Sequence, residues 1–218
     1  ALRGVDLEIA SPGFYGIMGQ SRSGKSTPLH LPPALDAPDA GEIEIASKPI
    51  HSMSERDATT FRRTGLGIVF QSFNLIPTLT ASENVELPGL LAGDDKSWLK
   101  DRSTELLDLL GLADRGKHRP EAMSGGEQQR VAIARSLLYS PPVLLADEPT
   151  GNLDSANSDR LWKLLGRVAE EQEITVVMVT HEPAAASHCE KVFVIRDGVV
   201  EGTIETEGLD AGGVAARY

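Results

Sequence analysis

Short apolar segments alternate with amphipathic stretches along this chain. Apolar runs of the length of buried strands occupy residues 14–18, 66–70, 143–146 and 175–180. Residues 192–195 and 199–201 flank Asp197-Gly198, where glycine accepts the positive φ of a tight hairpin turn. Strands that alternate with helical stretches predict an α/β fold with a mostly parallel sheet and antiparallel strands at its edge.

A helical pattern occupies residues 97–112. Its apolar positions are Leu99, Leu106, Leu107 and Leu110. Stretches containing Pro and Gly lie on either side of it, at 87–93 and 116–120. We expect a single domain over residues 1–218, with a helical subdomain at approximately 82–140 inserted in the α/β core.

Composition restricts the class of protein. The chain has 218 residues, of which 40% are hydrophobic and 24% charged, as in ordinary soluble domains. Its apolar runs are far shorter than the roughly 18 residues of a membrane span. The formal net charge of -11 disfavours nucleic acid as a partner, since such binding neutralises phosphates with Lys and Arg. The single cysteine, Cys189, is expected to have no chemical role and indicates a reducing compartment.

A glycine-rich loop follows the first apolar run. Its sequence, Gly19-Gln20-Ser21-Arg22-Ser23-Gly24-Lys25-Ser26-Thr27, matches G-x-x-x-x-G-K-[ST]. The backbone N–H groups of such a loop, and the positive end of the helix that follows, bind phosphates. Lys25 would reach the β- and γ-phosphates of ATP, and the Ser26 hydroxyl would ligate Mg²⁺. We therefore expect these nine residues to bind ATP.

Two carboxylates, Asp147 and Glu148, end the apolar run at 143–146. Ligands of open α/β sheets bind beyond the carboxyl ends of the strands, which places both side chains beside the phosphate loop. Asp147 would hold Mg²⁺, and Glu148 would act as general base on the attacking water. Adjacent residues of an extended strand point to opposite sides, so the two carboxylates could serve separate roles.

A further motif makes the pattern specific. Ser124-Gly125-Gly126-Glu127-Gln128-Gln129-Arg130 resembles the signature of ATP-binding cassette (ABC) ATPases. The order of the other motifs agrees with that family: Gln71, the signature, Asp147-Glu148, Asn152-Leu153-Asp154 and His181. The chain thus resembles the ATP-hydrolysing subunit of an ABC transporter, which implies a P-loop NTPase core.

The resemblance implies a homodimer in which two subunits, head to tail, enclose two Mg-ATP molecules. Each phosphate loop would face the signature of the other subunit, where Ser124, Gly125, Gly126 and Glu127 would form the cofactor-binding surface. Asp154 would couple the two sites. His181 would contact the γ-phosphate and orient the water. Gln71 would contact Mg²⁺ or water and connect ATP occupancy to the helical subdomain.

Within this family, the sequence resembles the lipoprotein-release and macrolide-export ATPases at residues 70–77, 83–85 and 148–155. This implies an integral membrane permease as partner. Residues 71–88 would transmit to it the closing and opening of the dimer that ATP binding and hydrolysis cause. The chain would then lie at the cytoplasmic side of the inner membrane. Family members also stack an aromatic residue on adenine, but Phe14 and Tyr15 fall in or beside a predicted strand and are expected in the core.

The sequence departs from the family pattern around the phosphate loop. Arg22 stands where the family generally has glycine, and Pro28, Pro32 and Pro33 follow. A proline within a helix costs about 3 kcal/mol or more, so the helix after the loop is predicted to be short or kinked near Leu31.

Two alternatives stay open. A nucleotide-binding regulatory subunit with impaired catalysis would accommodate Arg22 and the prolines, whereas Glu148 and His181 argue against it. A non-transport ABC ATPase that acts on DNA would divide the motifs with a long coiled coil. The interval from Lys25 to Ser124 has no heptads, and the charge is acidic.

Overall fold

A six-stranded sheet with the order β4-β5-β6-β1-β7-β8 forms the centre of the molecule. The computed structural model describes residues 3–9, 12–19 and 40–218. The strands are β1 (Gly13–Gly19), β4 (Gly67–Val69), β5 (Val143–Asp147), β6 (Thr175–Thr180), β7 (Lys191–Arg196) and β8 (Val199–Glu205). All neighbours pair in parallel except β7 and β8. The α/β fold with an antiparallel edge is confirmed.

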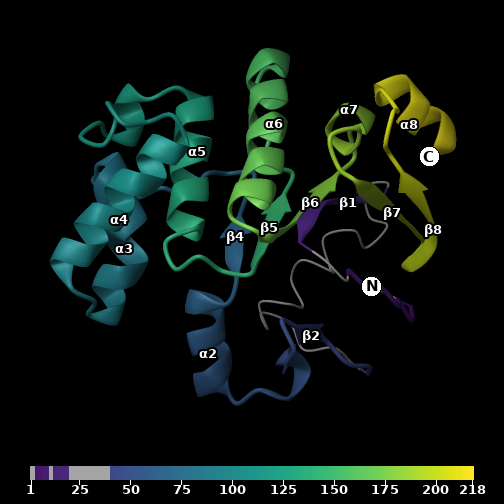
Figure 1. The fold of residues 1–218 in the computed structure, drawn as a ribbon, viewed down its shortest axis with the longest axis horizontal. Helices are drawn as coiled ribbons and strands as arrows, with labels where there is room; N and C mark the ends of the chain where they lie inside the picture. Colours follow the sequence, from purple (N-terminus) through teal and green to yellow (C-terminus); the bar gives the residue numbers. More distant parts are fainter. Residues whose placement is uncertain (1–2, 10–11, 20–39) are drawn as a thin grey trace.

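Helices cover both faces of this sheet (Figure 1). They are η1 (Ile50–Ser52), α2 (Glu55–Thr64), α3 (Ala81–Ala92), α4 (Lys96–Leu109), η2 (Pro120–Ala122), α5 (Gly125–Ser136), α6 (Ser155–Glu171), α7 (Pro183–Ala186) and α8 (Ala211–Arg217). A small hairpin of β2 (Glu44–Ile45) and β3 (Lys48–Pro49) lies near α2. The helices α3, α4 and α5 gather at one side of the sheet, away from both termini.

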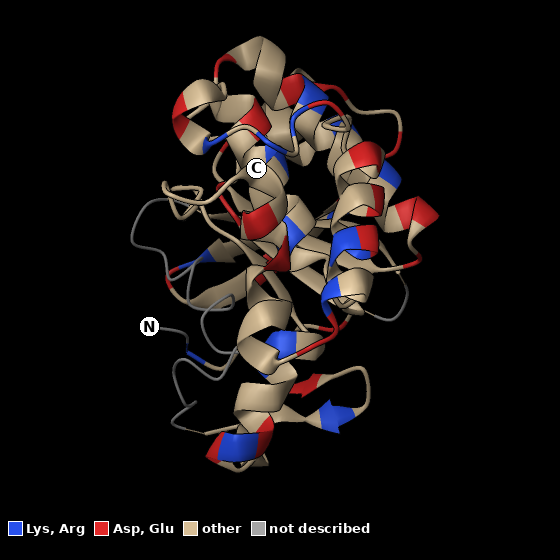
Figure 2. Cartoon of the chain, turned by 90° about the vertical axis from the view of Figure 1, so that its left-hand side faces the viewer, with Lys and Arg blue, Asp and Glu red and all other residues tan. Residues whose placement is uncertain are grey.

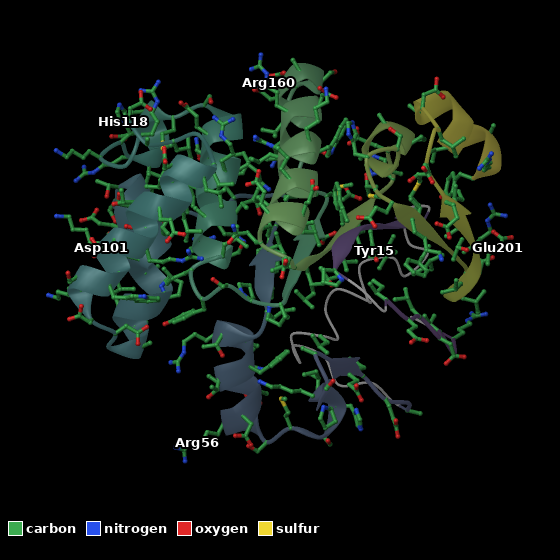
Figure 3. The ribbon with its side chains drawn as sticks, viewed as in Figure 1. Tyr15, Arg56, Asp101, His118, Arg160 and Glu201 are labelled. Carbon is green, nitrogen blue, oxygen red and sulfur yellow. The ribbon has the colours of Figure 1, made fainter. Side chains whose placement is uncertain are left out.

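Successive side chains of a strand point to opposite faces of the sheet, so the hydrophobic core forms two layers. In β1, Phe14 and Met18 join a hydrophobic cluster that includes buried side chains of α3 to α6, such as Leu106. Tyr15 and Ile17 face the other cluster, which includes Phe61 of α2. This is the period of two that buried strands require. Phe14 and Tyr15 are both core residues, as the sequence predicts, and Tyr15 is labelled within the sheet in Figure 3.

The predicted strands are confirmed, with differences at their ends. The segment 66–70 is a strand only over Gly67–Val69, and the segment 199–201 extends to Glu205. Asp197 and Gly198 have φ of 50° and 84°, so both central residues of the hairpin turn are left-handed. This is the turn that matches the right-handed twist of the flanking strands.

The helical prediction for 97–112 is confirmed as α4, but its neighbour was misjudged. The Pro/Gly-bearing stretch 87–93 lies largely inside α3, which runs through Pro88 and ends at Gly93 with φ 82°. A capping box starts the helix, with Thr80 bonded to the N–H of Glu83 and the Glu83 carboxylate bonded to the N–H of Thr80. These contacts, and the burial of α3 in the core, outweigh the hydrogen bond that Pro88 cannot form.

Charges of both signs are mixed over the helices (Figure 2). Within residues 3–9, 12–19 and 40–218, no helix has the length and apolar content that crossing a membrane requires.

Candidate ATP site at the carboxyl edge of the sheet

The strand register brings several predicted site residues to one edge. Asp147 of β5 pairs with Val179 of β6, and Val179 pairs with Ile17 of β1. Gly19, at the end of β1, and His181, just after β6, therefore lie at the same edge as Asp147. This is the edge where open α/β sheets bind ligands.

Glu148 and His181 meet at this edge. The Nδ1 atom of His181 lies 3.1 Å from Oε1 of Glu148, with the two side chains 56% and 23% exposed. Residues that follow two neighbouring strands, β5 and β6, thus form one polar pair that is partly open to solvent. The contact fixes the Glu148 carboxylate at the edge of the sheet where a ligand would bind.

The backbone at Glu148 differs from the expected geometry. The strand ends at Asp147, and Glu148 has a left-handed φ of 43°. The prediction that the two carboxylates alternate along an extended strand was therefore wrong. Two bonds hold the turn: the Glu148 N–H donates to Val179 O at 3.0 Å, and the Gly151 N–H donates to Glu148 O at 3.0 Å. A non-glycine residue in this conformation costs about 1–3 kcal/mol, which the surrounding contacts offset.

Gln71 lies against the same turn. Asn152 Nδ2 donates to the carbonyl oxygen of Gln71 at 2.9 Å. A Cβ atom at Gly151 would overlap the Gln71 side chain, so glycine permits this close approach. The turn after Glu148 therefore holds the predicted Gln71 at the carboxyl edge.

The signature begins α5. Ser124 is the N-cap: its Oγ accepts from the N–H of Glu127 at 3.3 Å, and Glu127 Oε2 accepts from the N–H of Ser124 at 2.8 Å. Arg115 Nε donates to the other carboxylate oxygen at 2.8 Å. The hydrogen bond from the Ser124 backbone, followed by that of Arg115, holds the pKa of Glu127 below its usual range. An ionised carboxylate only accepts hydrogen bonds, so Glu127 orients the helix start instead of donating to a phosphate.

The two signature glycines pack on the segment that carries Asp154. A methyl group added at Gly125 would lie 3.3 Å from Leu153 Cδ2, and one at Gly126 would lie 3.3 Å from Asn157 Oδ1. Asp154 in turn caps α6, accepting from the N–H of Asn157 at 3.0 Å and from its side chain at 2.6 Å. These bonds lower the pKa of Asp154. The structure thus brings Asp154 and the signature of one chain together.

The remaining predicted residues lie outside the described part of the chain. They are Gln20, Ser21, Arg22, Ser23, Gly24, Lys25, Ser26 and Thr27, together with Pro28, Leu31, Pro32 and Pro33, where a kinked helix is predicted.

Several residues at the site were missed in the sequence. Asn157 could have been found, because it stands three residues after Asp154, and aspartate is a residue type that favours the N-cap position. Arg115 and Arg135 gave no such signal, and Gln129 was named only as part of the signature, because each bonds a segment that is not its neighbour in the sequence.

The comparison with known families decides the assignment. A family model described as "ABC transporter" matches residues 2–151. The chain belongs to this family. The chain is also 41% identical to a cassette solved as a dimer in a post-hydrolysis state bound to ADP and Pi. That likeness has a TM-score of 0.83 and covers 95% of this chain and 91% of the other. The cassette is an ABC transporter ATP-binding protein of Methanocaldococcus jannaschii.

Two named groups of ABC proteins are similar over most of the chain. A lipoprotein-releasing system ATP-binding protein of Caulobacter vibrioides is 44% identical over 92% of this chain and 88% of its own length. A macrolide export ATP-binding/permease protein of Chlorobaculum tepidum is likewise 44% identical over 92% of this chain, which spans 30% of that longer protein.

Proposed function

We propose that this chain binds Mg-ATP and hydrolyses it in a head-to-tail homodimer that drives a membrane permease. The Glu148–His181 contact at the carboxyl edge, on the same edge as Gly19, carries the proposal. Gly19 is the first residue of the phosphate-loop motif, so a γ-phosphate bound there would lie at the edge that holds the pair. The ADP- and Pi-bound dimer of the similar cassette supports both the reaction and the assembly.

The edge residues fit a nucleotide and its metal. Carboxylate and amide oxygens are the donors that Mg²⁺ prefers, and Asp147 and Gln71 present both at this edge. Together with Ser26 they would hold Mg²⁺, which neutralises charge that develops on the transferred phosphoryl group. Glu148 would accept the proton of the attacking water, and His181 would hold that carboxylate and contact the γ-phosphate.

The signature would serve the other subunit. Ser124 and Asp154 are exposed, as residues that face a partner must be in one isolated chain. The Ser124 hydroxyl and the N–H groups of Gly125 and Gly126 would bind the partner subunit's γ-phosphate, at the positive end of α5. Glu127 would hold Ser124 in place, and Asp154 would couple the two sites through its contact with Asn157.

The permease would dock on the helical side of the molecule. We assign approximately residues 82–140 to the helical subdomain. Residues 71–88 would transmit the closing and opening of the dimer to the permease. Large apolar side chains are exposed on and near it: Ile76, Leu90, Leu91 and Trp98. The names of the similar proteins favour a lipoprotein-release or macrolide-export system, with the chain at the cytoplasmic side of the inner membrane.

ATP hydrolysis measured against protein concentration, with Glu148→Gln beside the wild type, tests the function. We expect activity that rises more than linearly with concentration, because each site needs two subunits. The Gln variant should lose about 10²-fold or more of kcat and still dimerise with ATP, since it cannot accept the proton. Glu173→Gln is the matched control, because Glu173 is exposed, also left-handed at φ 51°, and remote from the site.

Two results would contradict the proposal. Activity of Glu148→Gln equal to that of the wild type would remove Glu148 from the chemistry. ATP binding without turnover in the wild type would instead favour the regulatory subunit.

A further inference from the structure

Side chains of α5 hold the backbone on both sides of Gln71. Gln129 Nε2 donates to the carbonyl oxygen of Phe70 at 3.2 Å. Arg135, further along the helix, donates to the carbonyl oxygens of Phe73 at 3.1 Å and Asn74 at 2.7 Å. Three bonds therefore join the segment that carries Gln71 to the helix that begins at Ser124.

Stability alone does not explain Gln129. Its side chain is fully buried, and its Oε1 atom has no hydrogen-bond partner among the described residues. A buried polar atom left without a partner is unfavourable, and an apolar side chain of the same shape would avoid the cost. What the amide supplies, and an apolar side chain could not, is the bond to Phe70.

The same comparison with an apolar side chain applies to Arg135. Burial lowers the pKa of its guanidinium, and no carboxylate among the described residues offsets this shift. Within the described residues, its hydrogen bonds go to the carbonyl groups of Phe73 and Asn74. A partly buried charge that holds backbone carbonyls fixes that backbone at some cost in desolvation.

The opposite side of the segment is tied to the sheet edge. Asn152, in the turn after Glu148, holds the carbonyl oxygen of Gln71 at 2.9 Å. Phe73 Cζ also lies within 3.5 Å of the place where a Cβ of Gly125 would stand. Gln71 therefore lies between the turn after Glu148 and α5, the helix that begins with the signature. It is bonded directly to the turn, through Asn152, and its neighbours in the sequence are bonded to α5.

We propose that Gln129 and Arg135 are positioning residues that lock Gln71 to the signature helix and so couple the two ATP sites of the dimer. The proposal rests on the head-to-tail function given above. Gln71 serves the ATP of its own subunit, whereas Ser124 serves the ATP of the partner. The helix between Ser124 and Arg135 is about 16 Å long, and we expect it to move as one unit. A displacement of Gln71 on ATP binding is thus transmitted to the signature that the partner uses, and the coupling is reciprocal.

The test is the Hill coefficient of ATP hydrolysis, measured with the full chain at concentrations where it dimerises. Gln129→Met keeps the side-chain volume and removes the N–H donor. Arg135→Lys keeps the charge and removes the planar guanidinium, which can bond two carbonyl oxygens at once. We expect the Hill coefficient to fall from near the limit of about 2 for two sites to about 1 in Gln129→Met, and by less in Arg135→Lys. The Tm of Gln129→Met should change little, because the substitution removes the unpartnered Oε1 atom together with the donor to Phe70.

Arg102→Met is the matched control. Arg102 donates to the carbonyl oxygens of Leu137 and Leu138, just beyond the end of α5, and within the described residues it forms no hydrogen bond to residues 70–74. It should lower Tm and leave the Hill coefficient unchanged.

Three results would overturn the proposal: a wild-type Hill coefficient of about 1, a Gln129→Met variant with the wild-type coefficient, or an equal loss in Arg102→Met. Each is independent of the Glu148→Gln result, which judges the ATPase function by itself.

Discussion

At the scale of single residues, Glu127 places a negative charge where a phosphate of the partner's ATP is expected. The structure balances this charge with Arg115 and uses both carboxylate oxygens within the chain. The group is therefore a support for Ser124. Its pKa is lowered, so its ionised form contributes stability above the unfolded-state pKa of about 4.3. That contribution is lost as the pH falls through the folded-state pKa.

Arg115→Met should make the protein more sensitive to acid. Without the guanidinium the pKa of Glu127 moves up toward its ordinary value, and part of the stabilisation disappears. The shift is partial, because the Ser124 backbone bond is the largest cause and remains. Circular dichroism followed from neutral to acidic pH should show unfolding that begins at higher pH than in the wild type.

The control for this prediction is Arg62→Met. Arg62 makes a similar bond of 2.6 Å to Glu55, whose side chain is 85% exposed. Its removal should shift the acid transition less, because solvent screens the ion pair of the exposed Glu55, and an equal shift in both variants would contradict a specific role for Arg115.

At the scale of elements, α3 and α5 begin with the same device. Thr80 with Glu83, and Ser124 with Glu127, each form a complete capping box. Only the second faces the proposed partner's ATP. One local motif thus has a structural use in one helix and a structural and functional use in the other.

Ser124→Ala and Thr80→Ala should each lower the free energy of unfolding by about 1 kcal/mol, the usual value of a lost N-cap. Urea unfolding would measure this. ATP-dependent dimerisation, followed by size-exclusion chromatography with Glu148→Gln as background, should weaken only for Ser124→Ala. Equal weakening in Thr80→Ala would assign the effect to stability.

At the scale of the whole molecule, the sheet divides the interior into two layers. Cys189 lies in the layer covered by α3 to α6, and burial raises the pKa of its thiol. Because it is the only cysteine of the chain, its reactivity reports on one place in the core.

Ellman's reagent should label Cys189 at the rate at which the protein opens, far more slowly than after denaturation, since a buried protonated thiol is a poor nucleophile. ATP with Mg²⁺ should slow labelling of Glu148→Gln further, because ligand binding stabilises the folded state. Fast labelling of the native protein would contradict the burial of this side chain.

Much of the fold could be predicted because its signals are local. The apolar run of β1, the Asp-Gly turn and the order of the motifs are all readable over a few residues. The predictions failed where long-range contacts decide: α3 continues through Pro88 because it is buried, and β4 is short because Phe70 leaves the strand. Its carbonyl is instead bonded to Gln129 of α5.

The sequence alone determined which residues are polar and which strands they follow, so it placed Asp147 and Glu148 at one edge of an α/β sheet, and the family resemblance added His181. Tertiary structure decided how they meet. The left-handed turn at Glu148 and its contact with His181 depend on β5 and β6 lying side by side. The bonds from α5 to residues 70–74 join segments about 60 residues apart. Side-chain periodicity is a local property, whereas such contacts exist only once the chain has closed those loops.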